Sequence, residues 1–314
     1  EKEMSYFMSL NPLSLFRAMP GSIAQGMIWG VMALGVYITF RLLDFADLTV
    51  DGSIATGAAV SVMLIRAGVS PIATLPIAFL AGALAGMVTG LLNTALGIPG
   101  ILASILTQIS LYSINLNIMG KANQPVSVDN YPLVVSLRYV TDGSVSRLLF
   151  FLGMIVFLLA LIAVMYWYFG TEQGHAIRAT GCNSNMARAQ GINTNSRKVV
   201  GLMLSNGLVA LSGALLTQYQ GFSDVSMGRG AIVIGLAAVI IGEVVFSKVF
   251  HNFALKLLAV SIGAVIYYLV IQVVLWLGLN TNDLKMLTAA VVALFLAVPY
   301  WKSRYFSKGG KAHA

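Results

Sequence analysis

The feature that most constrains this chain is a series of long, uninterrupted apolar runs. Several of them reach the roughly 20 residues that a helix needs to cross about 30 Å of hydrocarbon. They do not alternate apolar and polar residues, as the strands of a membrane barrel would. The sequence therefore predicts an all-α, polytopic membrane helical bundle of about eight to nine spans. The runs lie near residues 22–42, 51–67, 71–92, 99–116, 148–169, 199–218, 231–246, 253–279 and 284–299.

The composition of the 314 residues agrees with a membrane protein. Hydrophobic residues make up 58% of the chain and charged residues only 10%, which is far from the mix of a soluble domain. The net charge of +8 resides in loops and tails, where membrane topology and anionic lipid account for it, so no nucleic-acid partner is expected. The single cysteine excludes an internal disulfide.

The chain divides into three parts by composition. Residues 1–21 carry Asn11, Pro12 and Pro20 and no clean small-residue cleavage site, so they are interpreted as a lead-in at the membrane surface rather than a signal peptide. Residues 22–300 form the transmembrane domain, which includes a hydrophilic loop at 170–198. Residues 301–314 form a basic tail.

The distribution of Lys and Arg predicts the orientation. If successive spans reverse direction, the basic residues of the 170–198 loop and of the tail share one side of the membrane. Cytoplasmic loops carry the excess of such residues. The loop and the C-terminus are therefore predicted to be cytoplasmic.

The loop contains a short predicted helix between Asn183 and Gly191. Asn is a good N-cap, and Gly suits the left-handed residue that follows a helix. A helix of about two turns buries no core of its own, so it either only fixes topology or docks into another protein. Docking is favoured, because the helix lacks the Trp, Phe or Leu face of a membrane-surface helix.

At this loop the sequence resembles the permease subunits of ABC importers of the branched-chain amino acid and ribose type. The resemblance covers about residues 26–300 and makes 22–300 a permease domain. Members often have an acidic residue where this chain has Cys182. The residues that carry the resemblance are Gly174, Arg178, Ala179, Gly181, Asn183, Ala187, Gly191, Ile192, Asn193 and Lys198, followed by the segment GLVALSGALL.

The resemblance implies a role for the short helix and a set of partners. It would be the coupling helix, which sits in a cleft of the ATP-hydrolysing subunit. Two ABC ATPase subunits, a second copy of the permease as a homodimer, and an extracytoplasmic solute-binding protein would complete an importer in the bacterial plasma membrane, in contact with lipid. The helix comprises Asn183, Ser184, Asn185, Met186, Ala187, Arg188, Ala189, Gln190 and Gly191.

The sequence offers no chemistry of its own for catalysis. It has no G-x-x-x-x-G-K-[ST] phosphate loop, so ATP and Mg are expected on the partner ATPase. No His, Cys or acidic cluster has metal-ligand spacing. We therefore expect no enzyme activity and no cofactor or metal in this chain.

Three segments are similar to a subgroup linked to amino-acid uptake, particularly of aromatic amino acids. They are DFADLTVDGS at residues 44–53, YSINLNIMG at 112–120 and GKANQPV at 120–126. The resemblance thus implies import of a small solute that is an amino acid.

Two short segments suggest an inverted internal repeat. DLTVDGSIATGAAV begins at Asp47 and DVSMGRGAIVIGLAAV at Asp224, and each has a hydroxyl residue two positions on, Thr49 in the first. In inverted-repeat transporters such paired segments border the substrate path. Asp47, Thr49, Asp51 and Asp224 are therefore either helix caps or path-lining groups.

Ser104, Gln108, Tyr112 and Asn115 recur at helical spacing in the fourth predicted span. They share one helical face, which either bonds neighbouring helices together or lines a path between two copies of the chain. The alternative to an ATP-driven importer is an ion-coupled secondary transporter, which would require an ionisable residue within the membrane. Such residues are scarce here.

Overall fold

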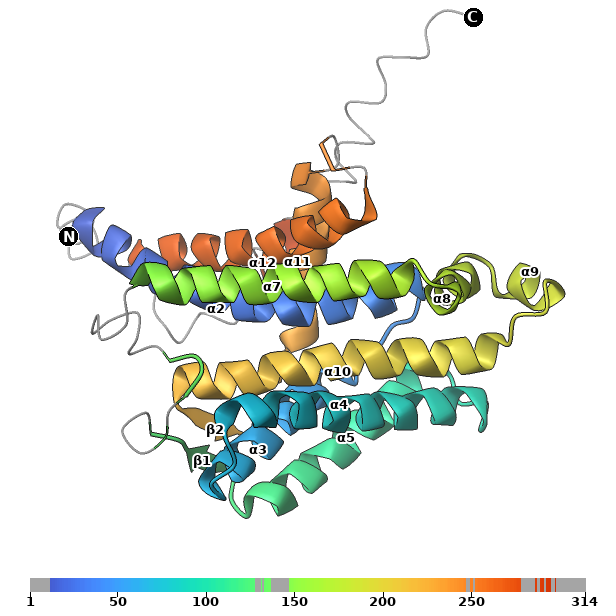
Figure 1. The fold of residues 1–314 in the computed structure, drawn as a ribbon, viewed down its shortest axis with the longest axis horizontal. Helices are drawn as coiled ribbons and strands as arrows, with labels where there is room; N and C mark the ends of the chain where they lie inside the picture. Colours follow the sequence, from blue (N-terminus) through green and yellow to red (C-terminus); the bar gives the residue numbers. More distant parts are fainter. Residues whose placement is uncertain are drawn as a thin grey trace, which may run out of the picture.

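The computed structural model describes residues 12–127, 131, 133–136, 147–246, 249–250 and 252–277, together with 286, 289–290, 292–294 and 297. The described chain is helical, with one short antiparallel ribbon, which confirms the predicted fold class (Figure 1). Eight of the nine predicted spans coincide with described helices, and the ninth lies largely outside them. The elements are α2 (Pro12–Tyr37), η1 (Ile38–Leu42), α3 (Val50–Arg66), α4 (Pro71–Thr94), α5 (Gly100–Met119), β1 (Asn123–Pro125), α7 (Arg147–Phe169), α8 (Glu172–Cys182), α9 (Ser184–Ala189), α10 (Thr194–Gln220), β2 (Phe222–Asp224), α11 (Ala231–Phe246) and α12 (Phe253–Trp276).

Six of the described helices are long and apolar enough to cross a membrane. The first begins earlier than predicted, because α2 starts at Pro12 and continues through Pro20. Proline fits the first turn of a helix, where its missing N–H costs nothing, and a proline further inside is tolerated in membrane helices. Part of the expected lead-in is thus helical, while residues 1–11 lie outside the described residues.

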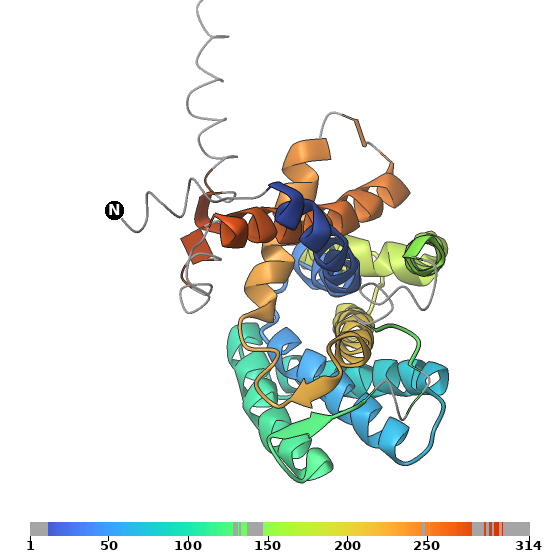
Figure 2. The ribbon, with the colours of Figure 1, turned by 90° about the vertical axis from the view of Figure 1, so that its left-hand side faces the viewer.

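Helix α10 is the centre of the bundle. Figure 2 shows it between α2 on one side and α3 and α4 on the other. Helices α4 and α10 pack closely through glycine: a Cβ on Gly82 would lie 2.2 Å from the Asn206 carbonyl oxygen, and one on Gly86 2.2 Å from that of Leu202. Glycine is therefore required where α4 crosses α10, because any side chain would separate the two backbones.

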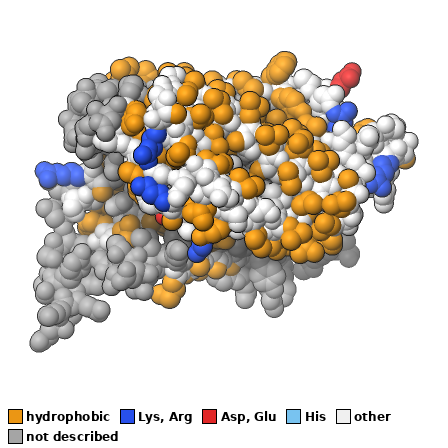
Figure 3. All heavy atoms as spheres, turned by 90° about the horizontal axis from the view of Figure 1, so that it is seen from below, with side chains coloured by type: hydrophobic (Ala, Val, Ile, Leu, Met, Phe, Trp, Pro, Cys, Tyr) orange, Lys and Arg blue, Asp and Glu red, His pale blue; other side chains and the backbone are white. Residues whose placement is uncertain are grey.

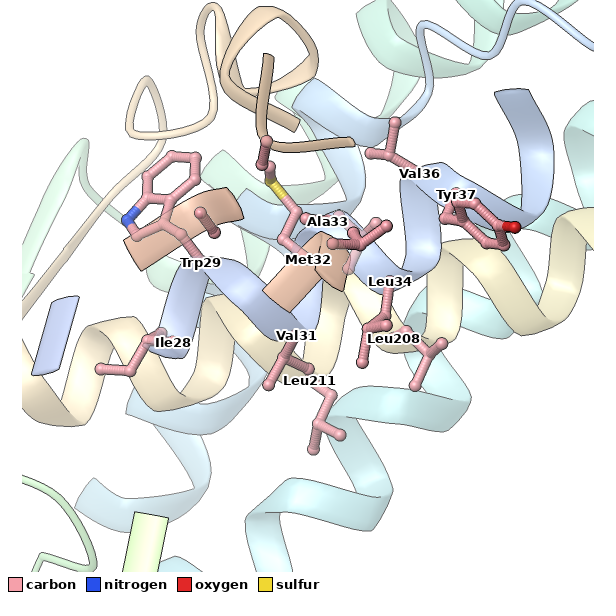
Figure 4. Close-up of a cluster of buried hydrophobic side chains, with 14 of the residues drawn as sticks. Ile28, Trp29, Val31, Met32, Ala33, Leu34, Val36, Tyr37, Leu208 and Leu211 are labelled. Carbon is pink, nitrogen blue, oxygen red and sulfur yellow. The ribbon is translucent and has the colours of Figure 1, made fainter. Parts of the chain in front are cut away.

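The apolar core lies between α2, α10 and the C-terminal helices. Val31 and Leu34 of α2 are fully buried and lie beside Leu208 and Leu211 of α10 (Figure 4), while the buried Met32 approaches Gly235 of α11. The outer surface is also apolar, as the face in Figure 3 shows. A bundle that is apolar both inside and outside is suited to a lipid surrounding. Lipid tails are as apolar as the core side chains, so an apolar residue is stable both in the core and on the lipid-facing surface.

Two helices begin inside the bundle rather than at its ends. The segment 43–49 turns back from the end of η1, and α3 then starts beside Asn206, near the midpoint of α10, where the Ser53 hydroxyl donates to the Asn206 side-chain oxygen at 2.6 Å. The segment 225–230 similarly enters from the β1–β2 ribbon and leads into α11. The N-termini of α3 and α11 therefore meet at mid-depth.

Candidate functional site

The short helix predicted at residues 183–191 is present as α9. The Asn183 Oδ1 accepts a hydrogen bond from the Met186 N–H at 3.0 Å, as expected of an N-cap. Gly191 has a φ of +83°, and the Ile192 N–H donates to the Ala187 carbonyl at 3.0 Å. This pairing closes the C-terminus in the manner of a Schellman motif. The two turns are thus fixed at both ends by their own sequence.

Helix α9 projects from one end of the bundle (Figure 1). Ala187 is its buried residue and anchors it, whereas Met186 is 62% exposed. Arg188 points back to the start of α10, where its Nε donates to the Thr194 hydroxyl at 2.7 Å and its Nη2 to the Asn195 side chain at 3.4 Å. The remaining residues of α9 expose their side chains or are partly exposed. The helix therefore offers an exposed surface that is capped at both ends, at the end of the bundle.

Helix α8, which precedes α9, was not predicted. Thr171 is its N-cap and Glu172 lies in its first turn, two start signals that the sequence does contain. Gly181 packs so tightly on η1 that a Cβ would lie 1.8 Å from the Leu42 carbonyl oxygen. Arg178 lies over the Phe253 ring of α12, 4.9 Å from its centroid. Helix α8 thus connects α9 to the membrane helices.

Asp47 and Thr49 lie in a buried hydrogen-bond network. The Asp47 carboxylate accepts from the Thr49 N–H at 2.9 Å and from the Asn206 amide at 2.7 Å. The Thr49 and Thr89 hydroxyls are 2.7 Å apart. Because these bonds join the 43–49 segment to α10 and α4, both residues act in this structure as connectors.

Asp51 joins the N-termini of α3 and α11. Its Oδ2 accepts from the Gly230 N–H and its Oδ1 from the Ile232 N–H, each at 2.9 Å. A Cβ on Gly228 would lie 1.9 Å from the Asp51 carbonyl oxygen, so the two segments are in backbone contact. Asp51 of α3 thus caps the N-terminus of α11, where its partner Gly230 lies 179 residues further along the sequence.

Asp224 mirrors Asp47 in its local geometry. Its Oδ1 accepts from the Ser226 N–H at 2.6 Å, as that of Asp47 does from Thr49. Asp224 also ends β2, where it pairs with Asn123 of β1. The two segments share a turn and both lead to a helix at mid-depth, while an internal repeat of the two halves stays a prediction.

An open pocket of about 360 Å³ lies between α3, α5 and the turn before α11. Gln108, Tyr112 and Asn115 line it together with Asp51 and Arg229. Three of the four residues predicted to share a face of α5 therefore meet at one cavity. The fourth, Ser104, is buried away from the pocket and donates to the Ile101 carbonyl at 2.8 Å.

Two features of the pocket are not explained by the fold. Asn115 is completely buried, and neither atom of its side-chain amide has a hydrogen-bond partner among the described residues. Arg229 places its guanidinium 6.0 Å from the centroid of the Tyr112 ring. Among the described residues the ion pair is that of Arg41 with Glu243, so Arg229 has no acidic partner there. Arg229 was not predicted as a site residue. In the sequence it is one basic residue among many, and such residues predict only the orientation of the chain in the membrane.

Comparison with known proteins identifies the family. The model of the branched-chain amino acid transport system / permease component family matches residues 19–304. A tyrosine transport system permease protein of Clostridioides difficile is 40% identical over 88% of this chain and 89% of its own length. Its name describes a transport component, not an enzyme.

More distant relatives are permeases of ABC systems. The inner membrane ABC transporter permease protein YjfF of Escherichia coli is 27% identical over 69% of this chain and 65% of its own length. The autoinducer 2 import system permease protein LsrC of Yersinia pseudotuberculosis is 30% identical over 68% and 58%, respectively. No solved structure matches the chain. The chain is an integral membrane protein that belongs to the branched-chain amino acid transport permease family of ABC importers.

Proposed function

We propose that this chain forms the substrate path of an ATP-driven, binding-protein-dependent importer and that α9 receives force from a separate ATPase. The observation that carries the proposal is α9 itself, a rigid helix exposed beyond the end of the bundle and capped at both ends. Within the described residues it is anchored by the buried Ala187 and by the bonds of Arg188 to the start of α10, and its other side chains are exposed or partly exposed. Its exposed surface is suited to a docking partner.

A continuous set of contacts links α9 to the interior of the bundle. Helix α8 directly precedes α9 in the chain and packs through Gly181 on Leu42 at the end of η1. From η1 the 43–49 segment leads directly to Asp51 at the N-terminus of α3. Displacement of α9 toward or away from the bundle would therefore shift the junction of α3 and α11, where the pocket lies.

The pocket side of the bundle is proposed to face a second copy of the chain. Helices α5 and α7 both lie largely on the surface, because only 28% of the most apolar stretch of each helix is buried. Helix α7 is the most apolar of the six candidate spans and α5 the least. Lipid requires an apolar surface, whereas a solute path does not. Helix α7 would therefore contact lipid, and two α5 faces would enclose the path.

The proposed solute is an amino acid of the aromatic class. The name of the C. difficile relative, 40% identical over most of both chains, supports tyrosine as the first solute to test. The distribution of basic residues supports a cytoplasmic position for the α9 end and the C-terminus in a bacterial plasma membrane. The extracytoplasmic binding protein would then deliver the solute at the β1–β2 end.

The test uses proteoliposomes that contain this chain with its ATPase and binding protein. We expect ATP-dependent accumulation of labelled L-tyrosine, L-phenylalanine or L-tryptophan. Uptake that instead follows a sodium or proton gradient, without any ATPase, would establish the secondary-transporter alternative and overturn the proposal.

Gly191→Ala tests the role of α9 with a matched control. Its φ of +83° is unfavourable for alanine, so the substitution disturbs the C-terminus of α9. Gly68 has a φ of +90° and the same open surroundings at the far end of α3, so Gly68→Ala imposes the same local strain away from α9. We expect Gly191→Ala to reduce uptake per ATP hydrolysed at least fivefold and Gly68→Ala to leave this ratio unchanged. Equal ratios in both variants would contradict the role of α9.

A further inference from the structure

The pocket between α3, α5 and the turn before α11 has an unusual balance of charge. Two residues of its lining are formally charged, Asp51 and Arg229. Asp51 accepts backbone N–H groups at the N-terminus of α11 and itself lies in the first turn of α3. Each helix N-terminus has the effect of roughly half a positive charge. The two helix N-termini therefore stabilise the negative charge of Asp51.

The positive charge of Arg229 remains without a counter-charge. The guanidinium lies over the Tyr112 ring and forms no ion pair with a described residue. Its neighbour Gly230 bonds Asp51, and the nearby Ser53 bonds Asn206 near the midpoint of α10. Arg229 thus lies at mid-depth of the bundle, where an ionisable side chain is costly and marks a functional position.

Asn115 adds a second, independent indication that the pocket binds something. It is completely buried and lines the pocket, yet within the described part of the chain its Nδ2 and Oδ1 both lack a hydrogen-bond partner. Buried polar groups are almost always hydrogen-bonded. An amide N–H donor and a guanidinium at one cavity are the groups that bind a carboxylate.

We propose that this pocket binds the carboxylate end of the transported solute, with the Arg229 guanidinium as its charge partner and the Asn115 amide as its hydrogen-bond donor. The proposal deepens the proposed import of an amino acid by assigning the part of the path that recognises its main-chain carboxylate. Tyr112 and Ile109, which also line the pocket, offer an aromatic and an apolar surface to the side chain.

Saturation-transfer NMR tests binding directly and without partner proteins. The full-length chain in nanodiscs is mixed with millimolar L-phenylalanine, 3-phenylpropionate, which lacks the ammonium group, or phenethylamine, which lacks the carboxylate. Empty nanodiscs provide the blank for partition into lipid. We expect transfer to the first two compounds and at least fivefold less to phenethylamine. Equal transfer to phenethylamine would overturn the proposal.

Arg229→Gln and Lys121→Gln form a matched pair of variants. Each removes one exposed positive charge, but Lys121 lies at the β1–β2 end of the bundle and does not line the pocket. We expect Arg229→Gln to reduce transfer to L-phenylalanine at least fivefold and Lys121→Gln to leave it unchanged. Wild-type transfer in Arg229→Gln would show that the guanidinium is not part of a binding site.

Asn115→Leu separates a binding role from a structural one. Leucine has a similar size and no polar atoms, so the empty protein should become more stable because an unpaired buried amide is removed. We expect a higher thermal unfolding temperature together with at least threefold weaker transfer to L-phenylalanine. A lower dimer fraction with unchanged transfer would assign Asn115 to an interface and overturn the proposal. Binding with no ATP-driven uptake would leave the pocket intact and refute the proposed function instead.

Discussion

At the scale of single residues, buried polar groups in this chain connect helices that the sequence separates widely. Asn206 is the clearest case, because its amide donates to Asp47 and its oxygen accepts from Ser53. It thereby holds the start of α3 against the middle of α10. Hydrogen bonds to a charged group contribute more than neutral ones, about 1.5–3 kcal/mol each.

Replacing Asn206 by leucine should therefore lower the free energy of unfolding by about 2–3 kcal/mol, because the buried Asp47 carboxylate loses a donor. Thr217→Val on the same helix is the control. The Thr217 hydroxyl is buried and has no hydrogen-bond partner in the part of the chain that the structure describes, so its removal should be neutral or stabilising. Unfolding of both purified variants in detergent measures the difference. A smaller loss for Asn206→Leu than for Thr217→Val would contradict this assignment.

At the scale of helices, glycine determines which elements can touch. A Cβ on Gly57 of α3 would lie 1.9 Å from the Ala210 carbonyl oxygen of α10. A Cβ on Gly153 of α7 would have no atom of the described residues within 4 Å, because α7 lies on the surface. The two glycines therefore have opposite roles, although both occur inside apolar helices.

We expect Gly57→Ala to separate α3 from α10 and to lower the unfolding temperature, with a loss of about 2 kcal/mol or more from overpacking. Gly153→Ala should instead raise stability by up to about 1 kcal/mol through helix propensity alone. Thermal unfolding of the two variants distinguishes them. Equal destabilisation by both would mean that glycine acts through backbone freedom and not through close approach.

The sequence predicted elements better than it predicted contacts. Apolar runs located eight of the described helices, and Asn183 with Gly191 located α9, because those signals are local. Helix α8 was missed because it is short and neither apolar enough for a span nor strongly amphipathic. The helical spacing of Gln108, Tyr112 and Asn115 predicted their shared face. Arg229 was missed, since only the folded chain brings it beside a helix more than 100 residues away.

At the scale of the whole molecule, the architecture places the capped, exposed helix α9 at one end and a pocket at mid-depth. Helix α8 and η1 connect the two, and the Arg41–Glu243 ion pair at 2.8 Å joins η1 to α11 at the same end. This arrangement is suited to transmitting a movement of α9 to the junction of α3 and α11. We propose that the ATPase subunit binds α9 directly and moves it.

The native Cys182 allows that claim to be tested directly. It is the single cysteine of the chain, is exposed and immediately precedes the N-cap of α9. A short cysteine-anchored photo-crosslinker is attached in the assembled transporter, with Cys182→Ser as the unlabelled control. Mass spectrometry of the product should identify the ATPase subunit as the partner of Cys182. A product that contains the binding protein, or none that contains the ATPase, would contradict the account.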